Sequence, residues 1–151
     1  MLAGELRLRI VRLRSETVHK SDFERFKTHF ASHCVFVTGL STSETGQLTT
    51  YLLNHDSDIP DAGVPIGYPM QDKEILLLDD SGQEVGLNRV GEIVVRSRYL
   101  AIGYWRRPEL TQAKFKAVAD QSEQRLCFTG DLALRLPDGC LVHKGRKDFR
   151  I

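Results

Sequence analysis

The sequence predicts a mixed α/β fold (α+β), in which a short α/β unit precedes a unit built mainly of strands. Residues 6–38 follow the succession strand, helix, strand. From Val64 onward short apolar runs alternate with turn signals, and segment 92–98 carries three successive β-branched residues between polar ends. We therefore expect residues 1–60 to close an α/β layer and residues 61–151 to form a β-rich subdomain.

Length and composition limit the function classes. The 151 residues are 41% apolar and 27% charged, which is typical of one soluble domain with a core. A net charge of +1 gives no reason to expect nucleic acid or an anionic membrane as partner. No apolar run is long enough for a membrane helix, and the first residues lack the apolar segment of a signal peptide. We predict a cytoplasmic protein.

Cysteine and histidine do not form a recognisable site. Cys34, Cys127 and Cys140 lack the paired spacing of zinc or redox motifs, so free and mostly buried thiols are expected. The histidines are scattered, and no Cys or carboxylate pattern around them completes a set of metal ligands.

The first expected strand carries Leu6, Leu8, Ile10 and Leu13 between arginines, which predicts one buried and one solvated face. A basic stripe for nucleic acid is the less favoured alternative.

A helix should follow this strand. Ser21 is the expected N-cap, with Glu24 reaching back to it as in a capping box. Phenylalanines at spacings of three and four then predict an amphipathic helix, and residues 35–37 predict a short apolar strand after it.

The segment from Thr38 to Gly46 is rich in hydroxyl groups and glycine, and it contains one carboxylate, Glu44. It follows a strand of an α/β sheet, where ligands tend to gather. The alternative is an ordinary polar turn leading into a strand at 48–53.

The second half should contain strands at 64–66, 73–78 and 92–98, and a hairpin whose turn lies at 137–139. Pro108 and Glu109 suit a helix N-terminus. The apolar side chains of this helix should face the core: Leu110, Ala113 and Phe115. Gly103, Tyr104 and Trp105 could form an aromatic cluster at a sheet edge.

Several motifs recur in the order and at the separations of a known family. They occupy residues 64–69 (VPIGYP), 91–105 (GEIVVRSRYLAIGYW), 108–115, 128–132 (FTGDL), 137–139 (PDG) and 145–151 (GRKDFRI). Together they resemble the adenylate-forming (AMP-binding) ligases, most closely the adenylation domains of nonribosomal peptide synthetases. Each motif alone is weak, but their common order over residues 64–151 is specific.

The resemblance implies a fold and a reaction. The chain would be the end of a three-layer α/β subdomain followed by a small distorted β-barrel that ends at the hinge to a C-terminal lid. The family activates a carboxylic or amino acid with ATP and Mg²⁺ to an acyl adenylate. The acyl group then passes to phosphopantetheine on a carrier protein or to coenzyme A.

The same resemblance implies roles for individual residues. Asp131 would accept the ribose hydroxyls, for which an ionised carboxylate is suited. Glu44 would be the magnesium carboxylate, and Ser43 would meet the phosphate. The remaining assignments are Arg146 at the ribose or phosphate, Leu40 at the adenine and Asp148 at the hinge. No catalytic residue is assigned.

The sequence also departs from the family pattern. Ser41 and Thr42 stand where the family has Gly and Pro, and Cys127 and Phe128 replace the commoner Tyr and Arg. The family's phosphate loop and the lysine of its lid have no counterpart in these residues. We therefore expect a fragment that is inactive alone; the alternative is a non-catalytic nucleotide-binding or regulatory module.

Overall fold

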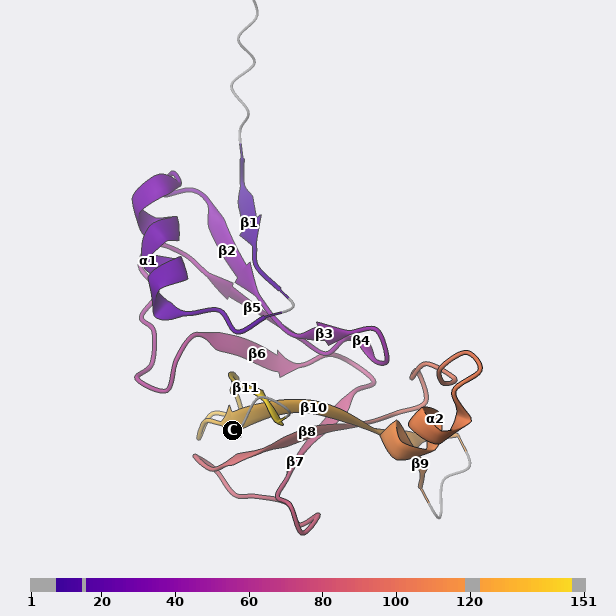
Figure 1. Ribbon diagram of the computed structural model, residues 1–151. Helices are drawn as coiled ribbons and strands as arrows, with labels where there is room; N and C mark the ends of the chain where they lie inside the picture. The colour runs from indigo at the N-terminus through magenta and orange to yellow at the C-terminus, as the bar shows by residue number, and fades with distance from the viewer. Residues whose placement is uncertain (1–7, 15, 119–122, 148–151) are drawn as a thin grey trace, which may run out of the picture.

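A computed structural model describes residues 8–14, 16–118 and 123–147 (Figure 1). Within these ranges the chain forms two helices and eleven strands. The first part contains β1 (Ile10–Arg12), α1 (Lys20–His29), β2 (Val35–Thr38), β3 (Ser41–Thr42), β4 (Gly46–Gln47) and β5 (Thr49–Leu53). The second part contains β6 (Pro65–Pro69), β7 (Glu74–Leu78), β8 (Val90–Ser97), α2 (Pro108–Lys114), β9 (Phe115–Ala117), β10 (Arg125–Arg135) and β11 (Leu141–Arg146).

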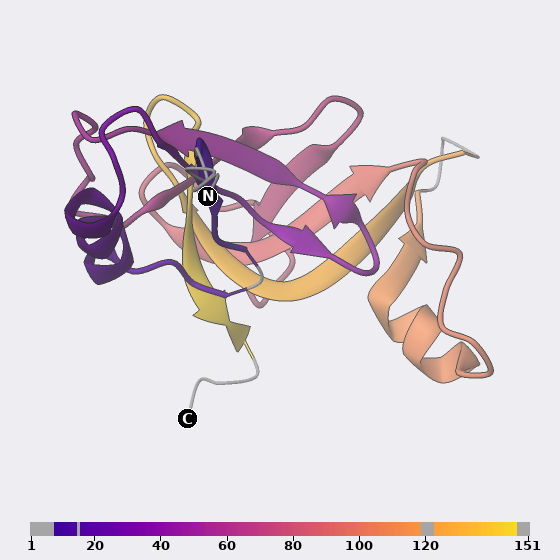
Figure 2. The same ribbon diagram turned by 90° about the horizontal axis from the view of Figure 1, so that it is seen from above.

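Nine strands join one sheet in the order β1-β2-β5-β6-β11-β10-β8-β7, with β9 also paired to β10. β1 and β2 are parallel, whereas the other neighbours in this sheet are antiparallel. β10 curves strongly along its length (Figure 2). The predicted α+β class is therefore confirmed. The predicted division at residue 60 falls in the connection between β5 and β6 and stays a prediction.

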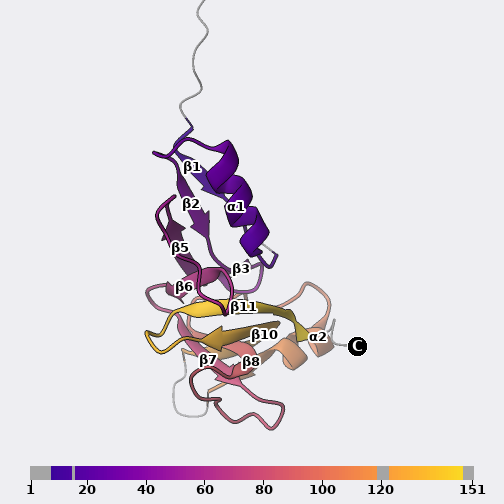
Figure 3. The same ribbon diagram turned by 90° about the vertical axis from the view of Figure 1, so that its left-hand side faces the viewer.

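A cluster of aromatic side chains fixes α1 on the sheet, on one side of β1, β2 and β5 (Figure 3). Phe23 and Phe26 are each 1% exposed, and the ring of Phe26 lies 5.0 Å from that of Phe36 on β2. The predicted amphipathic helix is thus confirmed, but its predicted cap is wrong. The Asp22 carboxylate accepts the His19 amide hydrogen at 2.9 Å, so the helix begins two residues before the position expected from Ser21 and Glu24.

The predicted buried face of the first strand is also wrong. Leu8, Ile10 and Leu13 are 47%, 59% and 38% exposed, and Leu6 lies outside the described residues. Val11 is the residue that packs against the cluster beneath α1. Because side chains alternate along a strand, contact through Val11 turns Ile10 to the opposite face, and Leu8 and Leu13 lie outside β1.

A second apolar cluster lies within the β-rich part. It is formed mainly by Leu40, Leu48, Ile66, Ile75, Leu77, Ile93, Val95, Leu100, Phe115, Cys127, Ala133 and Leu141. At the junction between the two parts, Gly67 has φ +93°, and a Cβ there would lie 2.1 Å from the carbonyl oxygen of Thr50 on β5. Only glycine allows this close approach of β5 and β6.

The helix α2 begins at Pro108 as predicted, but it does not pack as predicted. Leu110 is 47% exposed and Ala113 is exposed, whereas Phe115, just past the helix, is buried. The aromatic cluster expected at Gly103, Tyr104 and Trp105 forms only in part. The ring of Tyr104 lies 6.1 Å from that of Phe115, whereas Trp105 is 84% exposed.

The three cysteines are free and buried, as predicted. Over the described ranges, neither helix has the length and apolar character needed to cross a membrane.

Candidate functional site

The candidate site is built around a β-bulge in β10. The pairing of β10 with β8 shifts between Phe128 and Leu132, and the intervening Gly130 has φ +78°. The Thr129 hydroxyl donates to the Ile93 carbonyl at 2.8 Å and accepts the Asp131 amide hydrogen at 3.0 Å. A bulge re-aims the side chains around it, and here it presents the Asp131 carboxylate to β11.

Asp131 is buried and in contact with two cationic or potentially cationic groups. Its Oδ1 lies 3.1 Å from Nε2 of His143 and 3.6 Å from a guanidinium nitrogen of Arg146. The Asp131 side chain is 6% exposed, whereas that of Arg146 is 42% exposed. The structure therefore brings together two of the predicted site residues, Asp131 and Arg146, which also face each other in the β10–β11 ladder.

Glu44 lies in the turn between the two-residue strands β3 and β4, beside the exposed Ser43. Its carboxylate accepts a hydrogen bond from the Tyr104 hydroxyl, and its carbonyl accepts the Ala101 amide hydrogen at 2.8 Å. Burial tends to raise the pKa of Glu44, but hydrogen bonds from Tyr104 and Thr42 and the charge of Lys114 outweigh burial and lower it. Glu44 is thus held as a partly exposed anion.

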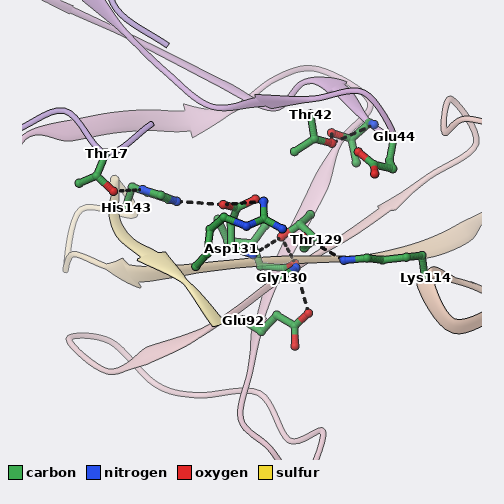
Figure 4. A network of polar contacts seen from close by, with 12 residues as sticks. Thr17, Thr42, Glu44, Glu92, Lys114, Thr129, Gly130, Asp131 and His143 are labelled. Atoms are coloured by element: carbon green, nitrogen blue, oxygen red, sulfur yellow. Dashed lines mark hydrogen bonds and ion pairs between the residues drawn. The ribbon is translucent and has the colours of Figure 1, made fainter. Parts of the chain in front are cut away.

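Lys114 contacts the bulge of β10 and influences the charge of Glu44. Its ammonium group donates to the Thr129 carbonyl at 3.2 Å, two residues before Asp131, and its charge acts on Glu44. Figure 4 shows Lys114 reaching toward Thr129 from one side and the row Thr17, His143, Asp131 on the other. The turn of Glu44 and the bulge that carries Asp131 therefore lie within reach of one lysine (Figure 4), and their joint role at one nucleotide stays a prediction.

Leu40 is placed less favourably for its predicted role. Leu40 is 6% exposed within the second apolar cluster, so its side chain offers little surface to an adenine ring. Its role at the adenine stays a prediction. Asp148 lies outside the described residues.

Sequence reasoning missed four residues of this region. His143 and Thr17 meet across 126 positions of sequence, and Tyr104 and Glu44 across 60. No local spacing could indicate such pairs. A weak signal existed for Lys114, because it lies in the last turn of a predicted helix that precedes the FTGDL motif.

Glu44 has the charge and exposure expected of a magnesium ligand. It is anionic, partly exposed and not neutralised by a direct salt bridge among the described residues. In the described part of the chain no three His, Cys, Asp or Glu side chains gather as a metal site. Mg²⁺ is commonly held by one or two carboxylates together with substrate phosphates and water. One carboxylate in this position is consistent with such a shared site.

Comparison with known proteins shows the family of the chain. Residues 3–105 match the family described as AMP-binding enzyme. Over 127 residues, 83% of this chain, the sequence is 35% identical to gramicidin S synthase 2 of Brevibacillus brevis. Over 88 residues it is 40% identical to gramicidin S synthase 1 of the same organism.

A solved structure of an adenylation-domain protein has a similar fold. PA1221, described as an NRPS protein containing adenylation and PCP domains, superposes on 92% of this chain with a TM-score of 0.77 and 29% identity. The chain spans 28% of that protein, 3% of gramicidin S synthase 2 and 8% of gramicidin S synthase 1.

Proposed function

The chain belongs to the AMP-binding enzyme family, and we propose that it is the part of an adenylation domain that holds the nucleotide. The intact domain would activate a carboxylic or amino acid with ATP to an acyl adenylate, for transfer to a thiol. The observation that carries this proposal is the meeting of Asp131 and Arg146 on one hairpin, which Lys114 links to the turn that carries Glu44.

Asp131 and Arg146 would act at the ribose end of ATP. A buried carboxylate can accept hydrogen bonds from two hydroxyl groups, and such charge-assisted bonds are stronger than neutral ones. Arg146 shares the same carboxylate and is more exposed, so its guanidinium can also meet a phosphate oxygen. The pair thus suits a ligand that combines hydroxyl groups with negative charge.

Glu44 would hold Mg²⁺, and the exposed Ser43 hydroxyl would donate to a phosphate oxygen. Bound Mg²⁺ would neutralise charge on the phosphates of ATP. Tyr104 orients the Glu44 carboxylate, and the lowered pKa of Glu44 keeps it ionised at neutral pH.

The acceptor in the intact protein would be a carrier protein, since PA1221 is described as containing adenylation and PCP domains. Coenzyme A is the alternative acceptor. We place the protein in the cytoplasm, where ATP is supplied. These 151 residues contain neither the phosphate loop nor the lid lysine that the family resemblance implies. We therefore expect the chain alone to bind nucleotide without forming an adenylate.

Calorimetric titration of the chain with ATP and Mg²⁺ tests the proposal. Asp131→Asn should weaken binding about tenfold or more, because an amide is a weaker acceptor than a carboxylate. Asp58→Asn, in an exposed loop, is the matched control and should bind normally. Absence of ATP binding by the unmodified chain would reject the nucleotide-holding role.

ATP–pyrophosphate exchange separates the two classes of function. We expect none from the chain alone and recovery when the missing parts of a related adenylation domain are supplied. Binding that is never accompanied by exchange would favour the non-catalytic module.

A further inference from the structure

The observation behind the further inference is His143, a histidine on β11 that is 8% exposed. Both nitrogens of its ring are engaged. Nδ1 lies 2.7 Å from the hydroxyl of Thr17, in the segment between β1 and α1, and Nε2 lies 3.1 Å from Oδ1 of Asp131. By contrast, Nδ1 of the half-buried His55 has no hydrogen-bond partner. A histidine held at both nitrogens has one fixed ring orientation.

The chemistry of the partners sets the direction of the bonds. An ionised carboxylate can only accept, so Nε2 of His143 carries the hydrogen that is donated to Asp131. In the neutral ring Nδ1 is then an acceptor, and the Thr17 hydroxyl donates to it. The carboxylate of Asp131 thereby selects the tautomer of His143, and the Thr17 hydroxyl holds the ring at its other nitrogen.

Two contacts of the Asp131 carboxylate fall on the same oxygen. His143 lies 3.1 Å and Arg146 3.6 Å from Oδ1. The burial of Asp131 prevents solvent from reorienting the group freely. The contact with His143 therefore fixes the orientation of the carboxylate that a ligand hydroxyl would meet.

We infer that His143 is a positioning residue for nucleotide binding: it holds the Asp131 carboxylate in the orientation that receives the ribose, and Thr17 holds His143. This inference rests on the proposed function. It adds a contribution from the N-terminal α/β part to a site on the β10–β11 hairpin, because Thr17 precedes α1 in the chain.

A purely structural role for His143 would predict something different. Loss of a buried hydrogen bond would weaken the fold, and every nucleotide would then bind less well in the same proportion. Positioning of Asp131 instead predicts loss of a specific discrimination, namely the preference for a ribose with hydroxyl groups over one without them.

NMR titration of the full chain with AMP and with 2′,3′-dideoxy-AMP measures this discrimination. The unmodified chain should prefer AMP by about tenfold, as expected for hydrogen bonds to a charged group. His143→Phe should lose most of that preference, and Thr17→Val should lose part of it. His143→Gln keeps an N–H donor and should restore the preference in part. His33→Phe removes an exposed histidine bonded to the Leu8 carbonyl and should change nothing.

The outcomes distinguish the positioning role of His143 from the proposed nucleotide-binding function. If His143→Phe and Thr17→Val weaken both ligands equally and keep the preference for AMP, the positioning role is wrong while the proposed function stands. If the unmodified chain binds neither ligand, or binds both equally, the proposed role of Asp131 fails and the inference fails with it. If His143→Phe does not fold, Thr17→Val and His143→Gln still give the answer.

Discussion

Asp131 and Glu44 are the two carboxylates of the candidate site, and they differ in burial and in the length of the strands that hold them. Asp131 lies within the eleven-residue strand β10, is 6% exposed and meets residues of β11. Glu44 lies in a turn between strands of two residues each and is partly exposed. The side chain of Asp131 is thus fixed by a long ladder, whereas that of Glu44 depends on hydroxyl groups of Tyr104, in a loop, and Thr42.

This difference suits two kinds of ligand. A ribose presents hydroxyl groups at fixed positions, and a buried, anchored acceptor binds such a group with the least loss of entropy. A hydrated cation shared with phosphates tolerates a carboxylate that can adjust. The comparison therefore predicts that replacing Asp131 lowers the stability of the fold, whereas replacing Glu44 mainly weakens magnesium binding.

The largest expected difference is in unfolding free energy. Asp131→Ala leaves Arg146 and the buried His143 without their carboxylate and should cost about 3 kcal/mol. Glu44→Ala removes a partly exposed group and should cost only about 0.5 kcal/mol. Urea unfolding followed by circular dichroism measures both values. Equal losses for the two variants would contradict the comparison.

The next effect concerns magnesium. In the unmodified chain Mg²⁺ should tighten ATP binding. In the presence of Mg²⁺, Glu44→Gln should weaken ATP binding about tenfold, equivalent to ~1.4 kcal/mol. AMP binding without metal should be unchanged, because Glu44 has no proposed role at the ribose. Calorimetry with and without Mg²⁺ makes the measurement, and Glu16→Gln, an exposed residue, is the control. A loss of AMP binding in Glu44→Gln would assign this carboxylate to the nucleotide itself.

A smaller effect should follow from Lys114→Met. Without this ammonium group the pKa of Glu44 should rise, because the charge of Lys114 is among the causes that lower it. A lowered pKa stabilises the fold above the unfolded value, and this contribution is lost as pH falls through the folded pKa. The variant should therefore lose less stability than the unmodified chain on acidification. The ¹³C titration of the Glu44 carboxyl group reports the shift.

Lys116→Met is the matched control for that experiment. Lys116 follows Lys114 by two residues, but its ammonium group lies over the ring of Phe128, 4.7 Å from the centroid. Its removal should leave the titration of Glu44 unchanged. An equal shift in both variants would mean that Glu44 responds to net charge rather than to Lys114.

The sequence predicted where the helices and strands lie better than it predicted which of their faces are buried. The β-branched run in β8 and the phenylalanine spacing in α1 are local patterns, so both elements were predicted within a few residues. The exposed Ile10 and Leu110 were placed in the core because an apolar residue indicates burial without indicating what covers it.

The candidate site was predicted in part, and for a different reason. Asp131 and Glu44 were singled out by motifs in order, which reflect ancestry rather than local physics. Their partners could not be found this way, since His143, Thr17 and Tyr104 act through contacts that only the three-dimensional fold creates. The bulge at Gly130 was likewise missed, because a glycine within a motif does not by itself reveal a positive φ within a strand.

The smallest expected effect lies at alkaline pH. Burial and the hydrogen bond to Glu44 raise the pKa of Tyr104 to about 12. Because its ordinary value is about 10, Tyr104 stabilises the fold fully below about pH 10, and this contribution is lost as pH rises toward 12. Since the side chain is only half-buried, solvent screening should keep the loss of stability small.

Absorbance at 295 nm can follow this ionisation. The pKa of Tyr68 is also raised to about 12, mainly by its hydrogen bond to Asp138, so the titration is best done in the Tyr68→Phe background. There, Glu44→Gln should move the ionisation of Tyr104 toward lower pH, because an uncharged amide no longer opposes the phenolate. An unchanged titration would mean that burial alone holds the hydroxyl proton, and the hydrogen bond from Tyr104 would then play no part in orienting the Glu44 carboxylate.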